Sequence, residues 1–436
     1  MNNINVGLLG FGTIGTGVFR VFEKNAQLIE RRLGASLTLA RIADLDITTD
    51  RGVTPAAGVL TTDVDEVISN PEIDVVIELI GGYEPAKSFI LKAIANGKHI
   101  VTANKALMAV HGEEILAAAE QYGVEVMFEA AVGGGIPIIS AIKENLCANQ
   151  FSSVLGILNG TCNFILTKMT DEGEDFAPVL KEAQELGYAE ADPTFDIEGV
   201  DTAHKIALLS ALCFGTRVDF EQVYTEGVTK ISALDIQFAR QMGYKIKLLA
   251  IGKQDEGQIE VRVHPTMIPE SYQLAEVDGV FNAVRLSGDF LGPAMLYGSG
   301  AGMDATASAV MGDLIAIARN VAAGVGRTSP IMGYCADQID TLPLKPMSEI
   351  VTQYYLRVTT VDRPGVLAQI SARLGDHNIS IQSMLQPERH EADAVPIVLM
   401  THEACEADIV KALEEIDALD IVQEPTRLIR VENDLG

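Results

Sequence analysis

Basic residues are scarce in this sequence. Its 436 residues include 32 Lys and Arg against 60 Asp and Glu, which gives a formal net charge of −28. A surface with this charge repels nucleic acid and anionic membranes, so neither is expected as a general partner. If the substrate or cofactor is an anion, the few cations must be gathered at its site. Each isolated lysine near a predicted site is therefore informative.

Long apolar runs, targeting segments and cysteine pairs are also missing. No stretch approaches about 18 uninterrupted apolar residues, so no membrane span is expected. The first residues enter a strand pattern directly, which predicts no signal peptide. The five cysteines are scattered and lack the C-x-x-C spacing of zinc sites. This pattern is typical of a protein of the reducing cytoplasm.

The length allows two or three domains, and three blocks can be distinguished. Residues 1–130 alternate apolar strands with helical stretches, which predicts an α/β unit with a parallel sheet covered on both faces. Its predicted strands are Ile4–Leu9, Leu37–Asp44, Val75–Ile80, His99–Thr102 and Val124–Phe128. Residues 131–327 form a mixed α+β block. After a proline-containing linker over 328–349, residues 350–436 predict a separate βαββαβ unit.

A glycine motif follows the first predicted strand and opens a helix. Gly10, Gly12 and Gly15 have the G-x-G-x-x-G spacing of Rossmann-type dinucleotide-binding folds. Because free N–H groups at a helix N-terminus can hold a pyrophosphate, no basic side chain is needed there. A purely structural glycine turn is the alternative. The predicted cofactor contacts are Gly10, Phe11, Gly12, Thr13, Ile14 and Gly15.

Two later strand ends extend the predicted cofactor site. Asp44 ends the second strand, where a carboxylate can accept hydrogen bonds from the adenosine ribose and favour NAD over NADP. Asp46 is the other candidate for this role, and both residues could instead be turn formers. Thr102 and Lys105 lie at the end of a further strand. Because ligands bind outside the carboxyl ends of parallel strands, we expect Lys105 beside the nicotinamide.

A lysine and an aspartate share one face of a predicted helix over Asp201–Phe214. Asp201 and Lys205 are four residues apart, and an exposed pair of this kind contributes only about 0.3–0.5 kcal/mol. The residues that follow, Ile206–Leu212, are almost wholly apolar, so we expect this helix to be buried. A buried lysine needs a partner, and a paired lysine in a cleft can donate a proton.

These motifs and several others follow one another along residues 4–325. The segments are Gly10–Gly15, Thr102–Lys105, Gly156–Phe164, Glu190–Pro193, Asp201–Lys205, Gly298–Gly302 and Thr306–Val310. As a set they resemble homoserine dehydrogenase, with Asn159-Gly-Thr and Asp201-x-x-x-Lys205 as the most specific parts. The resemblance implies reversible NAD(P)-dependent reduction of L-aspartate 4-semialdehyde to L-homoserine, the branch step toward threonine, methionine and isoleucine.

The same resemblance implies the domain roles. Residues 1–130 would be a Rossmann NAD(P)-binding domain. Residues 131–327 would be the catalytic and dimerisation domain, with the option that its last helices pack back on the first domain. A homodimer or homotetramer is implied. Near the second strand, Thr49 stands where many relatives carry a basic residue, which favours NAD or dual use.

The resemblance also implies roles for single residues. Lys205 matches the proton donor and Lys105 the second active-site lysine, while carboxylates suit the ammonium group of the substrate. The implied substrate-binding residues are Glu190, Asp201, Asp196 and Gly187. Gly302, before a helix expected to start at Thr306, matches a cofactor contact, although Met303-Asp304 departs from the family's usual loop. A site for a monovalent cation such as sodium, built largely from backbone carbonyls, is implied at Glu129, Val132, Gly134 and Ile136.

The last block begins with an apolar strand from Tyr354, followed by Asp362-Arg-Pro364-Gly365 and a helix. This arrangement resembles the ACT domain, in which the turn leaves backbone N–H groups for an amino-acid ligand. The resemblance implies a ferredoxin-like regulatory domain with threonine as a possible effector. The alternative is a dimerisation module without a ligand.

Two other functions remain open from the sequence. An acylating aldehyde dehydrogenase could use Cys162 as its nucleophile, but a thioester mechanism needs an activated thiolate, and no histidine is close in sequence. A buried structural cysteine is the simpler interpretation. A non-enzymatic amino-acid or NAD sensor is the third class, and the Asp201–Lys205 face argues against it.

Overall fold

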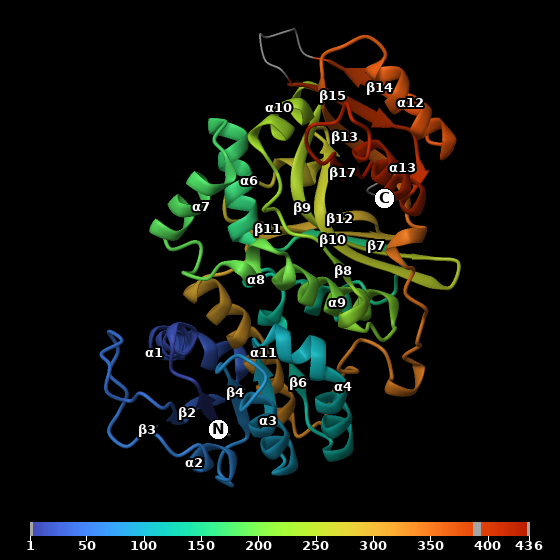
Figure 1. The fold of residues 1–436 in the computed structure, drawn as a ribbon. Coiled ribbons are helices and arrows are strands. Elements are labelled where there is room, and N and C mark those ends of the chain that lie inside the picture. The colour runs from blue at the N-terminus through green and yellow to red at the C-terminus, as the bar shows by residue number, and fades with distance from the viewer. Residues whose placement is uncertain (1–2, 387–393, 434–436) are drawn as a thin grey trace.

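The computed structural model describes residues 3–386 and 394–433. Figure 1 shows three tiers: the N-terminal residues at one end, a green and yellow middle tier, and the C-terminal residues at the other end. The expected regulatory block, 350–436, includes residues 387–393 and 434–436, which lie outside the described residues. Among the described residues, no helix has the length and apolar character needed to cross a membrane.

The N-terminal tier is a parallel six-stranded sheet in the order β3-β2-β1-β4-β5-β6. Its strands are β1 (Asn3–Leu9), β2 (Ser36–Ala43), β3 (Leu60–Thr61), β4 (Val75–Glu78), β5 (His99–Thr102) and β6 (Val126–Met127). Its helices are α1 (Thr13–Leu33), α2 (Asp65–Ile68), α3 (Ala86–Ala95) and α4 (Lys105–Tyr122). Along β4, Val75 and Ile77 enter the core that contains α1, whereas Val76 enters the core that contains α3 and α4. Burial on both faces explains the uninterrupted apolar runs of these strands.

A helix from much later in the chain completes this tier. Helix α11 (Met303–Ala323) packs on α1, with Val310, Leu314 and Ile317 in the same core as β1. The contact is close, since a Cβ on Gly17 would lie 2.7 Å from Met303 Cγ. The helix was expected to start at Thr306 but begins at Met303, because Gly302 adopts a φ of +105° and acts as its N-cap.

The middle tier is a mixed sheet covered by helices. Its strands are β7 (Phe151–Ile157), β8 (Tyr224–Thr225), β9 (Tyr244–Asp255), β10 (Gln258–Pro269), β11 (Phe281–Gly288) and β12 (Gly292–Ser299). Its helices are α5 (Ile138–Ser140), α6 (Gly160–Glu172), α7 (Phe176–Glu185), α8 (Thr194–Ile197), α9 (Val200–Phe214) and α10 (Ala233–Gln241). Helix α9 is buried over almost its whole length and lies between this sheet and the N-terminal tier.

The C-terminal tier has the expected order of elements. These are β13 (Val351–Val361), α12 (Val366–Asp376), β14 (Ile381–Leu385), β15 (Ala394–Thr401), β16 (Ala404–Cys405), α13 (Glu406–Asp417) and β17 (Arg427–Val431). It has a hydrophobic core of its own, and its strand β17 also pairs in parallel with β10, which joins both tiers into one sheet. The preceding segment, 328–349, is also anchored: the Ile259 N–H donates to the Pro343 carbonyl and the Lys345 N–H to the Ile259 carbonyl.

Candidate active site

The glycine loop between β1 and α1 has the shape needed to hold a phosphate group. Gly10 adopts a φ of +93°, and a Cβ there would lie 2.7 Å from the Leu79 carbonyl oxygen. A Cβ on Gly15 would lie 2.3 Å from the Gly10 oxygen, so this glycine permits close packing of helix and strand. Gly12 differs, because a Cβ there would meet no atom within 4 Å. The open space lies at the N-terminus of α1, where amide groups attract an anion.

The other predicted residues of this loop have distinct surroundings. Thr13 and Ile14 form the first turn of α1, and Gly12 is its N-cap without a side-chain hydrogen bond. Phe11 is buried against Phe19 with ring centroids 5.9 Å apart. The loop therefore offers backbone rather than side-chain donors, and its residues fit a dinucleotide.

The end of β2 carries a carboxylate that is already hydrogen-bonded. Asp44 Oδ2 accepts the Phe11 N–H and Oδ1 accepts the Asp46 N–H. Arg51, which belongs to none of the sequence motifs, approaches Asp44 at 3.8 Å and Asp46 at 3.6 Å. Its guanidinium also lies 5.3 Å from the centre of the Phe11 ring. Both charge signs therefore meet at the edge of the candidate cofactor site.

Thr102 has a structural partner at the end of β5. Its hydroxyl donates to the Glu78 carboxylate on the neighbouring strand at 2.7 Å, and both residues are buried. The Thr102 hydroxyl also accepts the Asn104 N–H, and the Asn104 side chain in turn caps α4 by accepting the Leu107 N–H. This network directs the start of α4, and with it Lys105, toward α9.

Asp201 lies between the two lysines. Its Oδ1 is 3.0 Å from Lys105 Nζ, and its Oδ2 is 2.7 Å from Lys205 Nζ. Lys205 Nζ also donates to the Leu158 carbonyl at 2.6 Å. Asp201 and Lys205 are only 3% and 8% exposed, so two charges of opposite sign are buried together. Lys105 remains about one-third exposed.

Asn159 organises the carboxylates around this pair. Its Nδ2 donates to Asp196 at 2.7 Å and to Asp201 at 2.9 Å, while its Oδ1 accepts the Cys162 N–H at the start of α6. In the sequence, Asn159 belongs to the Asn159-Gly-Thr motif, and no role was predicted for its side chain. The signal was available, because an Asn before Gly160-Thr161 is typical of a helix N-cap.

The pKa values of the site follow from burial and charge. Burial alone would raise the pKa of Asp201, but the Lys205 and Lys105 ammonium groups hold it well below its usual range. Burial lowers the pKa of Lys205, and repulsion from Lys105 lowers it further. Attraction to Asp201 offsets part of this decrease. The pKa of Lys105 is raised, because attraction to Asp201 outweighs the opposing effect of burial. Asp201 therefore stays ionised, and Lys205 gives up its proton more readily than an exposed lysine.

Glu190 and Gly187 lie at the exposed rim of this site. The Glu190 carboxylate is exposed, and its charge is among those that raise the pKa of Lys105. Gly187 adopts a φ of +76° in the exposed turn after α7. The structure thus brings Lys105, Lys205, Asp196 and Asp201 together, while Glu190 and Gly187 lie further out.

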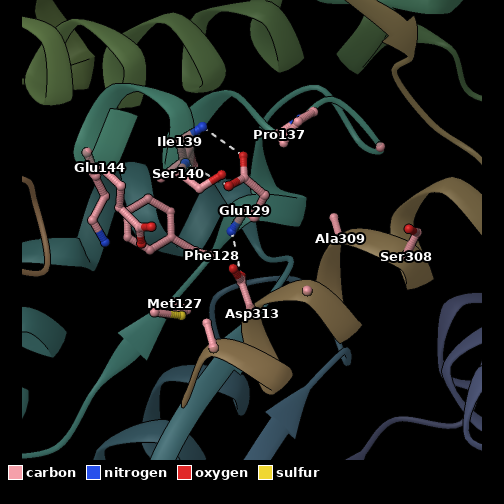
Figure 2. A pocket seen from close by; sticks show the side chains of 14 residues that line it. Met127, Phe128, Glu129, Pro137, Ile139, Ser140, Glu144, Ser308, Ala309 and Asp313 are labelled. Carbon is pink, nitrogen blue, oxygen red and sulfur yellow. Dashed lines mark hydrogen bonds between the residues drawn. The ribbon is translucent and has the colours of Figure 1, made fainter. Parts of the chain in front are cut away.

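The candidate cation loop runs from Glu129, which is labelled in Figure 2, to Ile136. The Glu129 carboxylate accepts the N–H groups of Ile139 and Ser140 at 2.7 Å, and its own N–H donates to Asp313. The described residues contain no group of three or more His, Cys, Asp or Glu side chains that could hold a metal ion. A cation here would depend on backbone oxygens, as expected for the hard monovalent ions.

This loop is closely packed on both sides. A Cβ on Gly134 would lie 2.5 Å from the Gly300 carbonyl, and the Gly135 N–H donates to the Ser299 carbonyl. Val132 and Ile136 are buried. On the other side, a pocket of about 350 Å³ is lined by Glu129 of the loop, Ser140 of α5 and Asp313 of α11 (Figure 2). The loop therefore packs directly against Gly300 and Ala301, next to Gly302.

Family models match three successive parts of the chain. The homoserine dehydrogenase NAD-binding domain matches residues 10–129, the homoserine dehydrogenase domain matches 137–315, and the ACT domain matches 354–420. A homoserine dehydrogenase of Neisseria gonorrhoeae is 48% identical, with 99% of each chain covered. The chain belongs to the homoserine dehydrogenase family.

Solved structures agree with this family assignment. A homoserine dehydrogenase from Thiobacillus denitrificans has a TM-score of 0.94 at 49% identity, covering 99% of each chain. A homoserine dehydrogenase from S. aureus has a TM-score of 0.77 at 32% identity, again covering 99% of each chain. The predicted fold class, with its Rossmann, α+β and ACT parts, is confirmed, as is the prediction of an NAD(P)-dependent oxidoreductase.

The alternative acylating aldehyde dehydrogenase finds no support. Cys162 is fully buried, its N–H donates to Asn159, and its Sγ lies 3.2 Å from the Asp196 carbonyl oxygen. Burial raises the pKa of the thiol well above its usual value. A homoserine dehydrogenase needs no thiolate, and this cysteine is not suited to provide one.

Proposed function

We propose that Lys205 is the proton donor for the reduction of L-aspartate 4-semialdehyde to L-homoserine. The observation that carries this role is the burial of Lys205 between the Asp201 carboxylate and the Leu158 carbonyl. A bound dinucleotide supplies or accepts the hydride at the nicotinamide. The alkoxide that develops on the former aldehyde oxygen takes a proton from Lys205 Nζ, and in the reverse direction neutral Lys205 accepts it.

The carboxylates and the second lysine of the site take the remaining roles, which are to hold the lysines and to bind and orient the substrate. We assign Asp201 to holding both lysines, because each of its oxygens already faces one of them. Glu190 is then the better carboxylate for the substrate ammonium group, with Asp196 and Gly187 shaping the same segment. Lys105 lies at the carboxyl end of β5, where it orients the substrate beside the nicotinamide.

For the cofactor, we propose dual use with a preference for NAD. The carboxylates of Asp44 and Asp46 favour a free ribose, and Arg51 gives a 2′-phosphate one positive partner. A hyperthermophilic archaeal homoserine dehydrogenase in complex with NADPH has a TM-score of 0.62 at 26% identity, over 72% of this chain and 97% of that chain. Gly10–Gly15 and Gly302 would contact either dinucleotide.

We further propose that the Glu129–Ile136 loop holds sodium through backbone oxygens. The carbonyls of Glu129 and Ile136 each accept one backbone N–H, which leaves a second lone pair on each. The buried carbonyls of Val132 and Gly134 complete the proposed set. Bound sodium would fix this loop against Gly300 and so stabilise the position of Gly302.

The ACT domain is the proposed site of feedback regulation by threonine. Gly365 adopts a φ of +88° and caps α12, where helix N–H groups face an incoming carboxylate. Because β17 shares a sheet with β10, a ligand that moves the ACT tier can act on the middle tier.

We also propose a homodimer or homotetramer located in the cytoplasm. The outer strand β12 carries Tyr297, whose half-exposed ring stacks on Phe281 with centroids 5.1 Å apart. An apolar edge strand of this kind favours pairing with another copy. All five cysteines are free, which suits a reducing compartment. Light scattering would measure the oligomeric mass.

One experiment tests these proposals together. Initial rates of homoserine oxidation are measured with NAD and with NADP, with and without threonine, in sodium and in a bulky organic cation. We expect turnover with both cofactors, a higher kcat/KM with NAD, inhibition by threonine and a lower rate without sodium. Each arm can fail separately: equal rates in both cation buffers would contradict the sodium site, and unchanged rates with threonine would contradict the regulatory role.

A further inference from the structure

Three aromatic rings lie next to the lysine pair and take no part in the chemistry described above. His204 precedes Lys205 on α9, and its ring stacks on Phe220 with centroids 4.0 Å apart and planes 12° apart. The same ring stacks on Phe195 of α8, with centroids 5.6 Å apart and planes 28° apart. Lys105 Nζ in turn lies 5.8 Å from the centre of the Phe195 ring.

His204 behaves in this stack as a neutral, flat side chain. It is 1% exposed, and within the described part of the chain neither ring nitrogen has a hydrogen-bond partner. Burial lowers its pKa to about 4, so the ring is uncharged at neutral pH. A histidine that acted as an acid or base would need at least one nitrogen in contact with a proton acceptor or donor. Its surroundings favour a packing role instead.

The short helix α8 is held from two directions. Asp196 accepts hydrogen bonds from Asn159 on one side, and Phe195 packs on His204 on the other. Phe195 is nevertheless 43% exposed, so its ring borders the open part of the site. Lys105 is itself partly exposed, and in the described residues its ammonium group contacts Asp201 and this ring. A lysine side chain has several rotatable bonds, so two contacts restrict its position far more than one.

We propose that Phe195, held in place by the ring of His204, is a positioning residue that keeps Lys105 against Asp201 and thereby tightens substrate binding. The inference rests on the proposed role of Lys105. It assigns no proton transfer to His204. The effect should therefore fall on the KM for homoserine, and a flat apolar ring at position 204 should replace the imidazole.

The test compares steady-state constants for homoserine oxidation in four variants. We expect Phe195→Leu and His204→Ala to raise the KM for homoserine about fivefold, with kcat changed less than about twofold, since a cation–π contact contributes about this factor. His204→Phe should restore both constants to within about twofold. Tyr122→Leu is the control, because Tyr122 is also a half-exposed aromatic residue and lies at the end of α4 opposite Lys105. It should leave the KM unchanged.

Several results would overturn the inference. An unchanged KM in Phe195→Leu would do so, and this exposed residue can be tested even if His204→Ala fails to fold, as judged by thermal unfolding. A His204→Phe variant as defective as His204→Ala would also do so, since the imidazole itself would then matter. Lys105→Met distinguishes the proposed role of Lys105 from the positioning role of Phe195. Full activity of Lys105→Met would rule out the role of Lys105. If Lys105→Met is impaired but Phe195→Leu is normal, only the positioning role of Phe195 is ruled out.

Discussion

The glycine loop and the lysine site differ in how an acidic protein would bind a negatively charged or polarised group in each proposed role. The loop at Gly10–Gly15 uses backbone amides and open space, and it needs no basic side chain. The lysine site buries two ammonium groups around the single carboxylate of Asp201. The first is a feature of local conformation, and the second depends on contacts between α4, α9 and the end of β7.

This difference separates binding from catalysis. Backbone N–H groups have a fixed protonation state, so they can hold a pyrophosphate but cannot release a proton. A buried lysine has an adjustable pKa, because burial and neighbouring charges act on it directly. Changes in the loop should therefore affect cofactor binding, and changes around Asp201 should affect turnover and its pH dependence.

The largest effect is expected from Lys205→Met. Loss of a positioned proton donor costs about 10²–10⁴-fold in rate, and we expect a fall in kcat of about 10³-fold. Binding of the reduced cofactor, followed by fluorescence titration, should change by less than about twofold, because the glycine loop is intact. Substantial turnover in this variant would show that another group supplies the proton.

Two glycine substitutions should distinguish the position in the loop that faces the cofactor from the one that packs against the strand. In Gly12→Ala the new methyl group enters the open space at the helix N-terminus, and we expect the KM for the cofactor to rise about tenfold without loss of stability. In Gly15→Ala the methyl group meets the Gly10 carbonyl oxygen, so the unfolding temperature should fall by several degrees. Cofactor kinetics and thermal unfolding distinguish the two. Equal loss of stability in both variants would contradict the proposal that the space next to Gly12 is open for the cofactor.

The pH dependence of the reduction rate tests whether burial and neighbouring charges set the pKa of Lys205. Because the donor must be protonated, the rate should fall as pH rises through the pKa of Lys205, and burial moves this fall below the pH expected for an exposed lysine. Lys105→Met removes a neighbouring positive charge, which raises the Lys205 pKa and shifts the fall to higher pH. A pH–rate profile of the residual activity provides the measurement. A shift in the opposite direction would mean that Lys105 does not act on Lys205 through its charge.

The smallest effect is expected at the ribose end of the cofactor. Arg51→Ala should raise the KM for NADP about threefold while the KM for NAD stays within about twofold, since a partly exposed ion pair contributes little. Parallel KM measurements with the two cofactors check this. An equal loss with both would indicate that Arg51 supports the loop through Phe11 rather than selecting the phosphate.

Short-range sequence patterns predicted much of the fold. The apolar runs predicted the parallel strands, and the β5 strand His99–Thr102 has the predicted bounds. Boundaries set by distant contacts were less predictable. Helix α11 starts at Met303 because Gly302 acts as its N-cap, and the pairing of β17 with β10, which lie far apart in sequence, joins the C-terminal tier to the middle sheet.

By itself the sequence determined the family, the glycine loop and the i,i+4 pairing of Asp201 with Lys205, because these depend on residue type and short spacing. Only the tertiary structure decided that one carboxylate holds both lysines, that Arg51 reaches the end of β2, and that His204 stacks on Phe195, whose ring faces Lys105. The residues in these contacts come from different elements of the chain. Their spacing in sequence carries no information about distance in space, and their pKa values arise only once burial brings the charges together.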